Sequence, residues 1–177
     1  MCWKCWLCCC CCCNREVNQR RQPRDERTLE TKSGWAHGWL GTDMTFIHCS
    51  IVSPELIKQN GIDPAFARER VVDKDGAQWQ WDRFVFAFLF DDDQSDIRPP
   101  KAATLLGFND NGFMYVVRLP AGTEYMCKDG AINLNKEIGF PNRIPWECVR
   151  KVYQWDSNKR QAIKIPKKDI KVENRFV

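Results

Sequence analysis

Beyond residue 40, short runs of apolar residues alternate with turn-forming residues, a pattern typical of β-strands. The strongest run covers residues 83–90, where Phe-Val-Phe-Ala-Phe-Leu-Phe follows an arginine. Because this run is aromatic and nearly continuous, it predicts a strand buried on both faces. Further strands are predicted at residues 44–49, 112–119, 137–140, 147–155 and 161–165.

One helix is predicted directly after the first of these strands. Ser53 can cap its first turn, Pro54 suits the first helical position, Glu55 places an acid near the helix N-terminus, and Gly61 ends it. Residues 101–108 predict a second, shorter helix. Strands thus outnumber helices, and the expected fold class is α+β with few helices. Loops are predicted at residues 34–41, 62–80 and 91–100.

Composition divides the chain into three parts. Residues 34–177 are expected to form a single domain, residues 14–33 are polar and predict a linker, and residues 1–13 form a cysteine-rich arm. No apolar run approaches the ~18 residues that a membrane-spanning helix needs. Residues 1–32 hold seven Lys or Arg and four Asp or Glu, which is +3 of the net charge of +4. The rest of the chain therefore carries about +1, and no nucleic-acid partner is expected.

Cysteine is concentrated in the arm, which holds eight of the 11 in the chain. A run of six neighbouring cysteines cannot form an orderly set of disulfides, and a zinc site needs spaced pairs of ligands. Residue 2 is not glycine, so the arm is not an N-myristoylation signal. The cysteines concerned are Cys2, Cys5, Cys8, Cys9, Cys10, Cys11, Cys12 and Cys13.

The arm resembles the S-acylated cysteine strings of peripheral membrane proteins. Trp3, Trp6 and Leu7 suit a lipid interface, and the arginines from Arg15 to Arg27 suit anionic headgroups. The resemblance implies palmitoylation and a membrane surface as a partner of the arm. Two other interpretations stay open, which are metal or redox chemistry of exposed thiols and a low-complexity terminus without a role.

Three stretches of the domain are candidates for chemistry. The first runs from His48, Cys49 and Ser50 at a strand end through the helix to Asn-Gly-Ile at 60–62. The second is Phe-Met-Tyr-Val-Val-Arg-Leu-Pro-Ala-Gly at 113–122, and the third joins Glu137 to Ile-Pro at 144–145. Taken singly, each has an ordinary structural explanation: a half-buried histidine, a helix cap, a core strand or a surface acid.

In this order, the three stretches resemble the mono-ADP-ribosyltransferase toxin fold over about residues 44–155. In that family a strand ends in Arg or His, a helix follows, and a catalytic Glu precedes Ile-Pro by seven and eight residues, as Glu137 precedes Ile144 and Pro145 here. The resemblance implies an ADP-ribosyltransferase-like split β-sandwich. It also implies NAD as the substrate, with no metal expected.

The resemblance assigns a role to each candidate residue. Glu137 would stabilise the cation that forms as nicotinamide leaves, and His48 would orient NAD; both would face one groove. Asn135, two residues before the Glu, would orient the acceptor. The remaining NAD-binding candidates are Cys49, Ser50, Phe84, Phe86 and Tyr115, whose aromatic members would stack on nicotinamide.

Two features depart from the family pattern. The strand that carries Ser-Thr-Ser in Arg-type members, and a Tyr in His-type members, here reads Phe-Val-Phe-Ala-Phe at 84–88. The position of Asn135 is Glu or Gln in other members. Both departures keep a second interpretation open, in which the domain is a lipid-anchored, inactive protein-interaction module on the same fold.

The leading hypothesis is a membrane-tethered mono-ADP-ribosyltransferase that modifies a protein. A bacterial effector or toxin fits it best, secreted into a host cell that supplies acyltransferases and held at the cytosolic face of a membrane. Without such delivery the protein would be cytoplasmic. A thiol-rich metal buffer, with the arm as the active part, is the third alternative.

Overall fold

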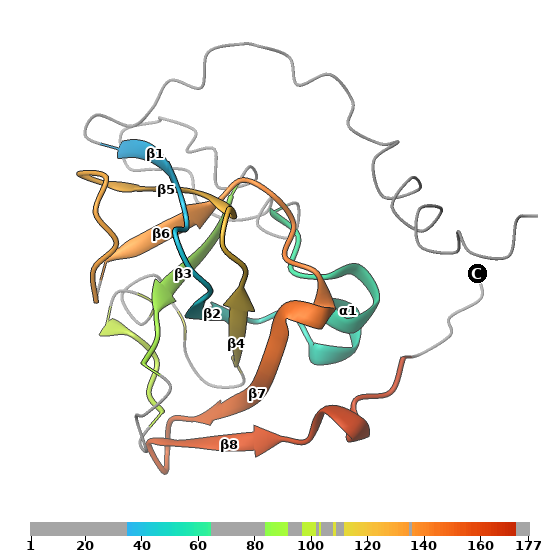
Figure 1. The fold of residues 1–177 in the computed structure, drawn as a ribbon. Helices are drawn as coiled ribbons and strands as arrows, with labels where there is room; N and C mark the ends of the chain where they lie inside the picture. The colour runs from blue at the N-terminus through green and yellow to red at the C-terminus, as the bar shows by residue number, and fades with distance from the viewer. Residues whose placement is uncertain are drawn as a thin grey trace, which may run out of the picture. The chain divides into compact units, whose positions relative to one another are not determined.

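Eight strands form one antiparallel sheet beside the α-helix α1 (Pro54–Asn60) in the part of the chain that the structure describes (Figure 1). The structure is a computed structural model, and it describes residues 35–64, 84–91, 97–101, 103, 108, 112–134 and 136–172. All of these residues belong to one compact unit, Lys32–Val177. The fold is therefore mainly β and α+β-like, as the sequence predicted.

The strand order across the sheet is β1-β5-β6-β3-β2-β4-β7-β8, so β3 and β2 lie at its centre. Every pair of neighbours is antiparallel. The strands are β1 (Trp35–Trp39), β2 (Met44–Ser50), β3 (Val85–Leu89), β4 (Phe113–Leu119), β5 (Glu124–Lys128), β6 (Glu137–Phe140), β7 (Val149–Asp156) and β8 (Gln161–Ile165).

The structure confirms the six predicted strands and adds two. The loop predicted at 34–41 is wrong, because Trp35–Trp39 form edge strand β1 against β5. Strand β5 is the second addition, since the sequence does not predict a strand there. The strand predicted at 147–155 begins only at Val149, after the 3₁₀ turn η3 (Trp146–Cys148).

The predicted helix is confirmed as α1 (Pro54–Asn60). The Ser53 hydroxyl accepts a hydrogen bond from the Leu56 amide, which is the expected N-cap. Gly61 ends the helix with a φ of 71°, in the region that favours glycine. Of the second predicted helix, Lys101 and Ala103 are helical, and most of the rest lies outside the described residues.

Hydrophobic residues pack on both faces of the sheet. The face that carries Phe46, Tyr115 and Ile138, called the first face below, packs against Ile57 of α1. The opposite face, called the second face, carries a smaller cluster. Successive side chains of a strand project to opposite faces of the sheet. Neighbouring residues of β4 belong to different clusters, so each cluster lies on one face. The second cluster comprises Ile47, Phe88, Phe90, Ala103, Phe108, Met114, Val116 and Tyr153.

The two central strands are joined over a short length. β2 pairs with β4 over seven residue pairs, but with β3 only at Phe46–Leu89 and Ile47–Phe88. A hydrogen bond from the Phe90 amide to the Thr45 carbonyl extends this contact toward the start of β2. The end of β2, which carries His48, is thus paired to β4 on one side and lies beyond the β2–β3 ladder on the other.

Candidate functional site

The fold brings the candidate stretches onto neighbouring central strands. Glu137 is the first residue of β6 and lies directly opposite Phe88 of β3. Phe88 in turn lies opposite Ile47 of β2, and His48 follows Ile47. Because neighbouring strands are about 4.8 Å apart, β6 and β2 are separated by about 10 Å. Glu137 and His48 therefore belong to adjacent rows of the sheet, two strands apart.

His48 connects β2 to β3 where their backbone ladder has ended. Its Nδ1 is 2.7 Å from the Phe86 carbonyl oxygen. A carbonyl only accepts, so Nδ1 carries the hydrogen and donates it. Burial lowers the pKa of the imidazole below its ordinary 6.5, and the hydrogen bond to Phe86 offsets part of that shift. His48 is therefore neutral at pH 7, with Nε2 as a hydrogen-bond acceptor.

The two candidate catalytic side chains start from opposite faces of the sheet. Glu137 shares the second face with Phe88 and Ile47, since directly paired residues project to the same side. His48 pairs with Tyr115, which lies on the first face, and the two rings are 6.2 Å apart. The expectation that both side chains face one groove is therefore not met by the strand register. What the register does place beside Glu137 is the aromatic side of β3.

Three half-buried aromatic residues gather on that second face. The Phe84 and Phe86 rings are 6.1 Å apart, and Trp35 of β1 meets the Phe86 ring edge-on at 6.2 Å. Phe84 and Phe86 lie over Gly139 of β6, where a Cβ would come within 3.3 Å of Phe86 and 3.4 Å of Phe84. Trp35, Phe84, Phe86 and Gly139 are called the aromatic cluster below.

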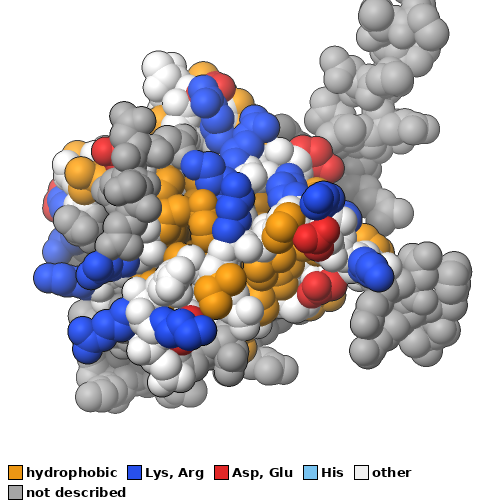
Figure 2. Space-filling view, turned by 90° about the horizontal axis from the view of Figure 1, so that it is seen from below, with side chains coloured by type: hydrophobic (Ala, Val, Ile, Leu, Met, Phe, Trp, Pro, Cys, Tyr) orange, Lys and Arg blue, Asp and Glu red, His pale blue; other side chains and the backbone are white. Residues whose placement is uncertain are grey.

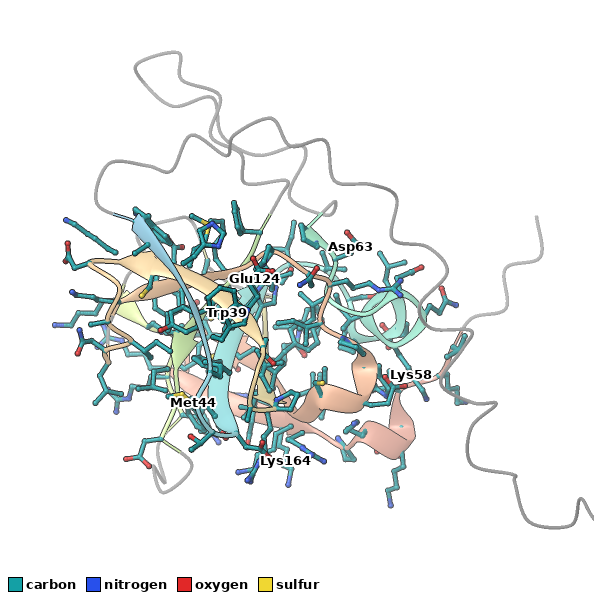
Figure 3. All side chains as sticks on the ribbon, turned by 45° about the horizontal axis from the view of Figure 1, so that its top comes forward. Trp39, Met44, Lys58, Asp63, Glu124 and Lys164 are labelled. Atoms are coloured by element: carbon teal, nitrogen blue, oxygen red, sulfur yellow. The ribbon has the colours of Figure 1, made fainter. Side chains whose placement is uncertain are left out.

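The other tryptophan of β1 has a different environment. Trp39 stands opposite Glu124 of β5, and Figure 3 labels both side chains. The Trp39 side chain is 67% exposed. Glu124 also lies 3.4 Å from Nδ1 of His37. Of the two tryptophans of β1, only Trp35 is therefore placed next to the candidate site.

The remaining predicted site residues have structural positions. Tyr115 is fully buried, and its hydroxyl donates to the Val52 carbonyl, so it belongs to the core rather than to a ligand surface. The Ser50 hydroxyl accepts from the Val52 amide at 3.1 Å. Burial raises the pKa of the Cys49 thiol to about 12, which keeps it protonated. Asn135 and the arm cysteines lie outside the described residues.

The sequence analysis missed one contact that links the first and third stretches. The Ile62 amide donates to the Ile144 carbonyl at 2.8 Å, and the Ile144 amide donates to Ile62 at 2.9 Å. The Asn-Gly-Ile end of α1 is thereby held against the Ile-Pro that follows Glu137. Trp35 and Gly139 were also missed, because no local pattern connects them to β3.

Two further features concern only the residues that the structure describes. Within those ranges, no helix is long and apolar enough to cross a membrane. In the same part of the chain, no group of three or more His, Cys, Asp or Glu residues is arranged to hold a metal ion.

Comparisons with family models, with curated proteins and with solved structures found no match to this chain. The functional assignment consequently depends on the residues and geometry described above.

Proposed function

We propose that this chain is a mono-ADP-ribosyltransferase that takes NAD as its substrate and modifies a protein, on an ADP-ribosyltransferase-like split sheet. The observation that carries the proposal is the position of Glu137 on β6, on the face that holds the aromatic cluster. The backbone pairing of Ile62 with Ile144 supports it, since it joins the two ends of the resemblance. The short β2–β3 ladder supports the split.

The residues of the second face suit the chemistry of NAD. Flat aromatic rings over a glycine offer a stacking surface for nicotinamide, and a carboxylate accepts hydrogen bonds from ribose hydroxyls. In the transfer, the bond from ribose C1′ to nicotinamide breaks and nicotinamide leaves with the electron pair. The acceptor side chain bonds to C1′ and releases a proton. Glu137 would stabilise the positive charge that develops on the ribose between these events.

His48 has a positioning role in this proposal. Its Nδ1–H holds the Phe86 carbonyl, and Phe86 presents its ring to the second face. His48 would thus fix the aromatic cluster from the opposite side of the sheet, with Nε2 left as an acceptor. This differs from direct orientation of NAD, which the sequence resemblance implied.

The test of catalysis is Glu137→Gln, which removes the charge and keeps the shape. NAD hydrolysis and labelling of target proteins should fall at least 100-fold, because the charge on the ribose is no longer stabilised. Glu147→Gln is the matched control, as Glu147 is an exposed acid of η3. Unchanged hydrolysis and labelling in Glu137→Gln would remove the catalytic assignment.

The test of positioning is His48→Ala compared with His48→Asn. Asn can still donate a hydrogen bond to the Phe86 carbonyl, while Ala cannot. A positioning role predicts a raised KM for NAD in His48→Ala and partial recovery in His48→Asn. Equal kcat losses without any change in KM would contradict it.

A second candidate function is a non-catalytic protein-binding module. The apolar strand Val85–Leu89 favours it, because it supplies no hydroxyl at the place of the family's Ser-Thr-Ser. Isothermal titration with NAD separates the two proposals. If the wild-type chain shows heat of NAD binding and Phe86→Asp does not, the result supports the transferase. If the wild-type chain does not bind NAD, the result supports the module.

We also propose that the arm is palmitoylated and anchors the chain at the cytosolic face of a host membrane. One acyl chain binds a bilayer only marginally and two bind stably, so several adjacent cysteines favour anchoring. Hydroxylamine-sensitive acyl exchange on the chain expressed in eukaryotic cells tests this, with all eight arm cysteines changed to Ser as control. Equal signals from both chains would refute the anchor.

A further inference from the structure

Positive charge is concentrated in one part of the folded chain. Residues 143–172 contain nine Lys or Arg and three Asp or Glu, a net charge of +6. The other described residues contain six Lys or Arg and seven Asp or Glu, a net charge of −1. The modest total charge therefore hides a strong asymmetry within the domain.

Most of these basic residues follow β7 in the sequence and lie at one edge of the sheet. Residues 149–165 form β7 and β8, of which β8 is an edge strand, and the 3₁₀ turn η4 (Lys167–Asp169) continues from it. Figure 1 shows β8 and η4 on one side of the domain, and Figure 2, seen from that side, shows Lys and Arg side chains beside hydrophobic ones. Figure 3 places Lys164 far from Trp39 and Glu124, in agreement with the strand order.

Specific contacts fix this edge to the domain. The Lys58 ammonium of α1 donates to the Ile170 carbonyl at 2.6 Å, and the Lys167 ammonium donates to the Val149 carbonyl at 2.6 Å. Lys167 also lies 4.6 Å from the centre of the Trp146 ring. Since Ile170 is buried in the first-face core, the segment after β8 has a defined position. The exposed cations next to it are thus presented by ordered backbone.

Two exposed aliphatic side chains accompany these cations. Ile163, opposite Gln154, is 43% exposed and projects to the face of β8 away from Lys164, which lies opposite Tyr153; both side chains flank the open edge of this edge strand. Val172 is 42% exposed and follows Lys171. Cations next to exposed aliphatic residues suit a lipid headgroup region, where the charges meet anionic headgroups and the aliphatic groups enter the interface. Phosphate contacts to a nucleic acid require the cations and gain nothing from the aliphatic groups.

We infer that the β8–η4 edge, with Lys164, Lys168, Lys171, Ile163 and Val172, is a docking surface for an anionic membrane. It orients the domain on the bilayer independently of the arm's acylation and of any binding of NAD. This contact goes beyond the proposed lipid anchor, which attaches the chain but leaves the orientation of the domain open.

Sedimentation with lipid vesicles tests the inference on the full-length, unacylated chain made in bacteria under reducing conditions. Vesicles of phosphatidylcholine with 30% phosphatidylserine are compared with phosphatidylcholine alone. The triple change of Lys164, Lys168 and Lys171 to Gln should weaken partitioning onto anionic vesicles by about 100-fold if each cation contributes as surface cations usually do. The matched control changes three exposed cations elsewhere, Arg98, Lys101 and Lys128, to Gln.

A second variant tests whether the exposed aliphatic side chains contribute to vesicle binding in addition to the positive charges. Ile163→Ser with Val172→Ser leaves every charge in place and should weaken vesicle binding about tenfold, while binding to duplex DNA stays unchanged. Circular dichroism checks that each variant is folded, and Lys168→Gln with Lys171→Gln replaces the triple variant if β8 is disturbed.

Three results would overturn the inference. One is equal loss in the triple variant and its control. Another is full vesicle binding in the triple variant, which would assign all binding to the arm. The third is tight binding to duplex DNA that the Lys changes abolish, together with vesicle binding that the Ile163 and Val172 changes leave intact. Because these assays contain no NAD and no acylated chain, their outcome is separate from the tests of the transferase and of the anchor.

Discussion

The hydroxyl of Tyr115 joins the centre of the sheet to the corner where β2 leads into α1. Tyr115 is fully buried on β4, and its hydroxyl donates to the carbonyl of Val52, which lies in that corner. The residue also pairs with His48 across the β2–β4 ladder. Tyr115→Phe removes the hydrogen bond and keeps the ring, so it isolates the contribution of the hydroxyl.

The expected cost follows from what remains after the change. Loss of a neutral hydrogen bond that leaves a buried carbonyl without its donor costs about 1–3 kcal/mol. Val52 is half-buried, so water can partly replace the donor, and we expect about 1–2 kcal/mol. For a domain of this size, the melting temperature should fall by about 3–8 °C.

The same residue provides a second test at high pH. Burial, helped by the negative charge of Glu55, raises the pKa of the Tyr115 hydroxyl well above its ordinary 10.0. Above pH 10 the unfolded chain releases this proton and the folded chain keeps it, so unfolding becomes more favourable as the pH rises. The Phe variant lacks this term. The stability difference between the two proteins should therefore be full at pH 7.5 and smaller at pH 10.5.

Urea unfolding followed by tryptophan fluorescence measures both effects. Tyr153→Phe is the control, since Tyr153 is also buried but no hydrogen bond of its hydroxyl occurs among the described residues. A cost below 0.5 kcal/mol for Tyr115→Phe, or a cost equal to that of Tyr153→Phe, would show that the corner does not depend on this hydrogen bond. A difference that stays constant between pH 7.5 and 10.5 would refute the raised pKa.

Three further predictions concern the candidate site. The pKa of His48 is lowered in the folded chain, so the unfolded chain binds a proton first as the pH falls below 6.5. The free energy of unfolding of the wild type should therefore fall by up to about 1 kcal/mol between pH 7.5 and 5.5. Urea unfolding should show no such loss in His48→Gln. Cys49, with a pKa of about 12, should react with iodoacetamide at pH 8.5 at least 100-fold more slowly than the arm cysteines. Peptide mapping by mass spectrometry measures the labelling of each cysteine, and denaturant should abolish the difference. Gly139→Ala should displace the Phe84 and Phe86 rings and cost about 1–3 kcal/mol in thermal unfolding, whereas Gly41→Ala, with open space around it, should cost little; equal effects would contradict the packing described for Gly139.

The elements that could be predicted from the sequence are those with a strong local pattern. The strand at 112–119 has a continuous apolar run, and α1 has both its N-cap serine and its terminal glycine. The sequences of β1 and β5 lack such a pattern, because these two strands are stabilised by pairing with each other and not by a local apolar run. Gly38 argues against a strand when read locally, yet a Cβ there would come within 2.6 Å of the Tyr125 ring on β5. That glycine makes room for a side chain that only the tertiary pairing brings close.

The site could be predicted only as far as strand positions. The order of the motifs predicts that His48 and Glu137 lie on central strands of one sheet, where β3 separates β2 from β6, but it does not predict the face of each side chain. A shift of one residue in register moves every side chain of a strand to the other face. The register is set by pairs such as Phe88–Glu137 and Phe86–Gly139, which no spacing within one segment reveals. For the same reason, the sequence predicts Tyr115 as a ligand contact, although it lies in the core.

The short ladder between β2 and β3 links the stability of the sheet to its proposed function. Two central strands gain most from full pairing, since each backbone hydrogen bond contributes about 1 kcal/mol and water is excluded there. Here the β2–β3 ladder stops at Ile47, and a side chain, His48, makes the next connection to Phe86. A neutral imidazole in this place keeps the strands together without closing the backbone ladder. Local departures of this kind are concentrated at functional sites, and in the proposed transferase this one holds Phe86, and with it the aromatic cluster, in place.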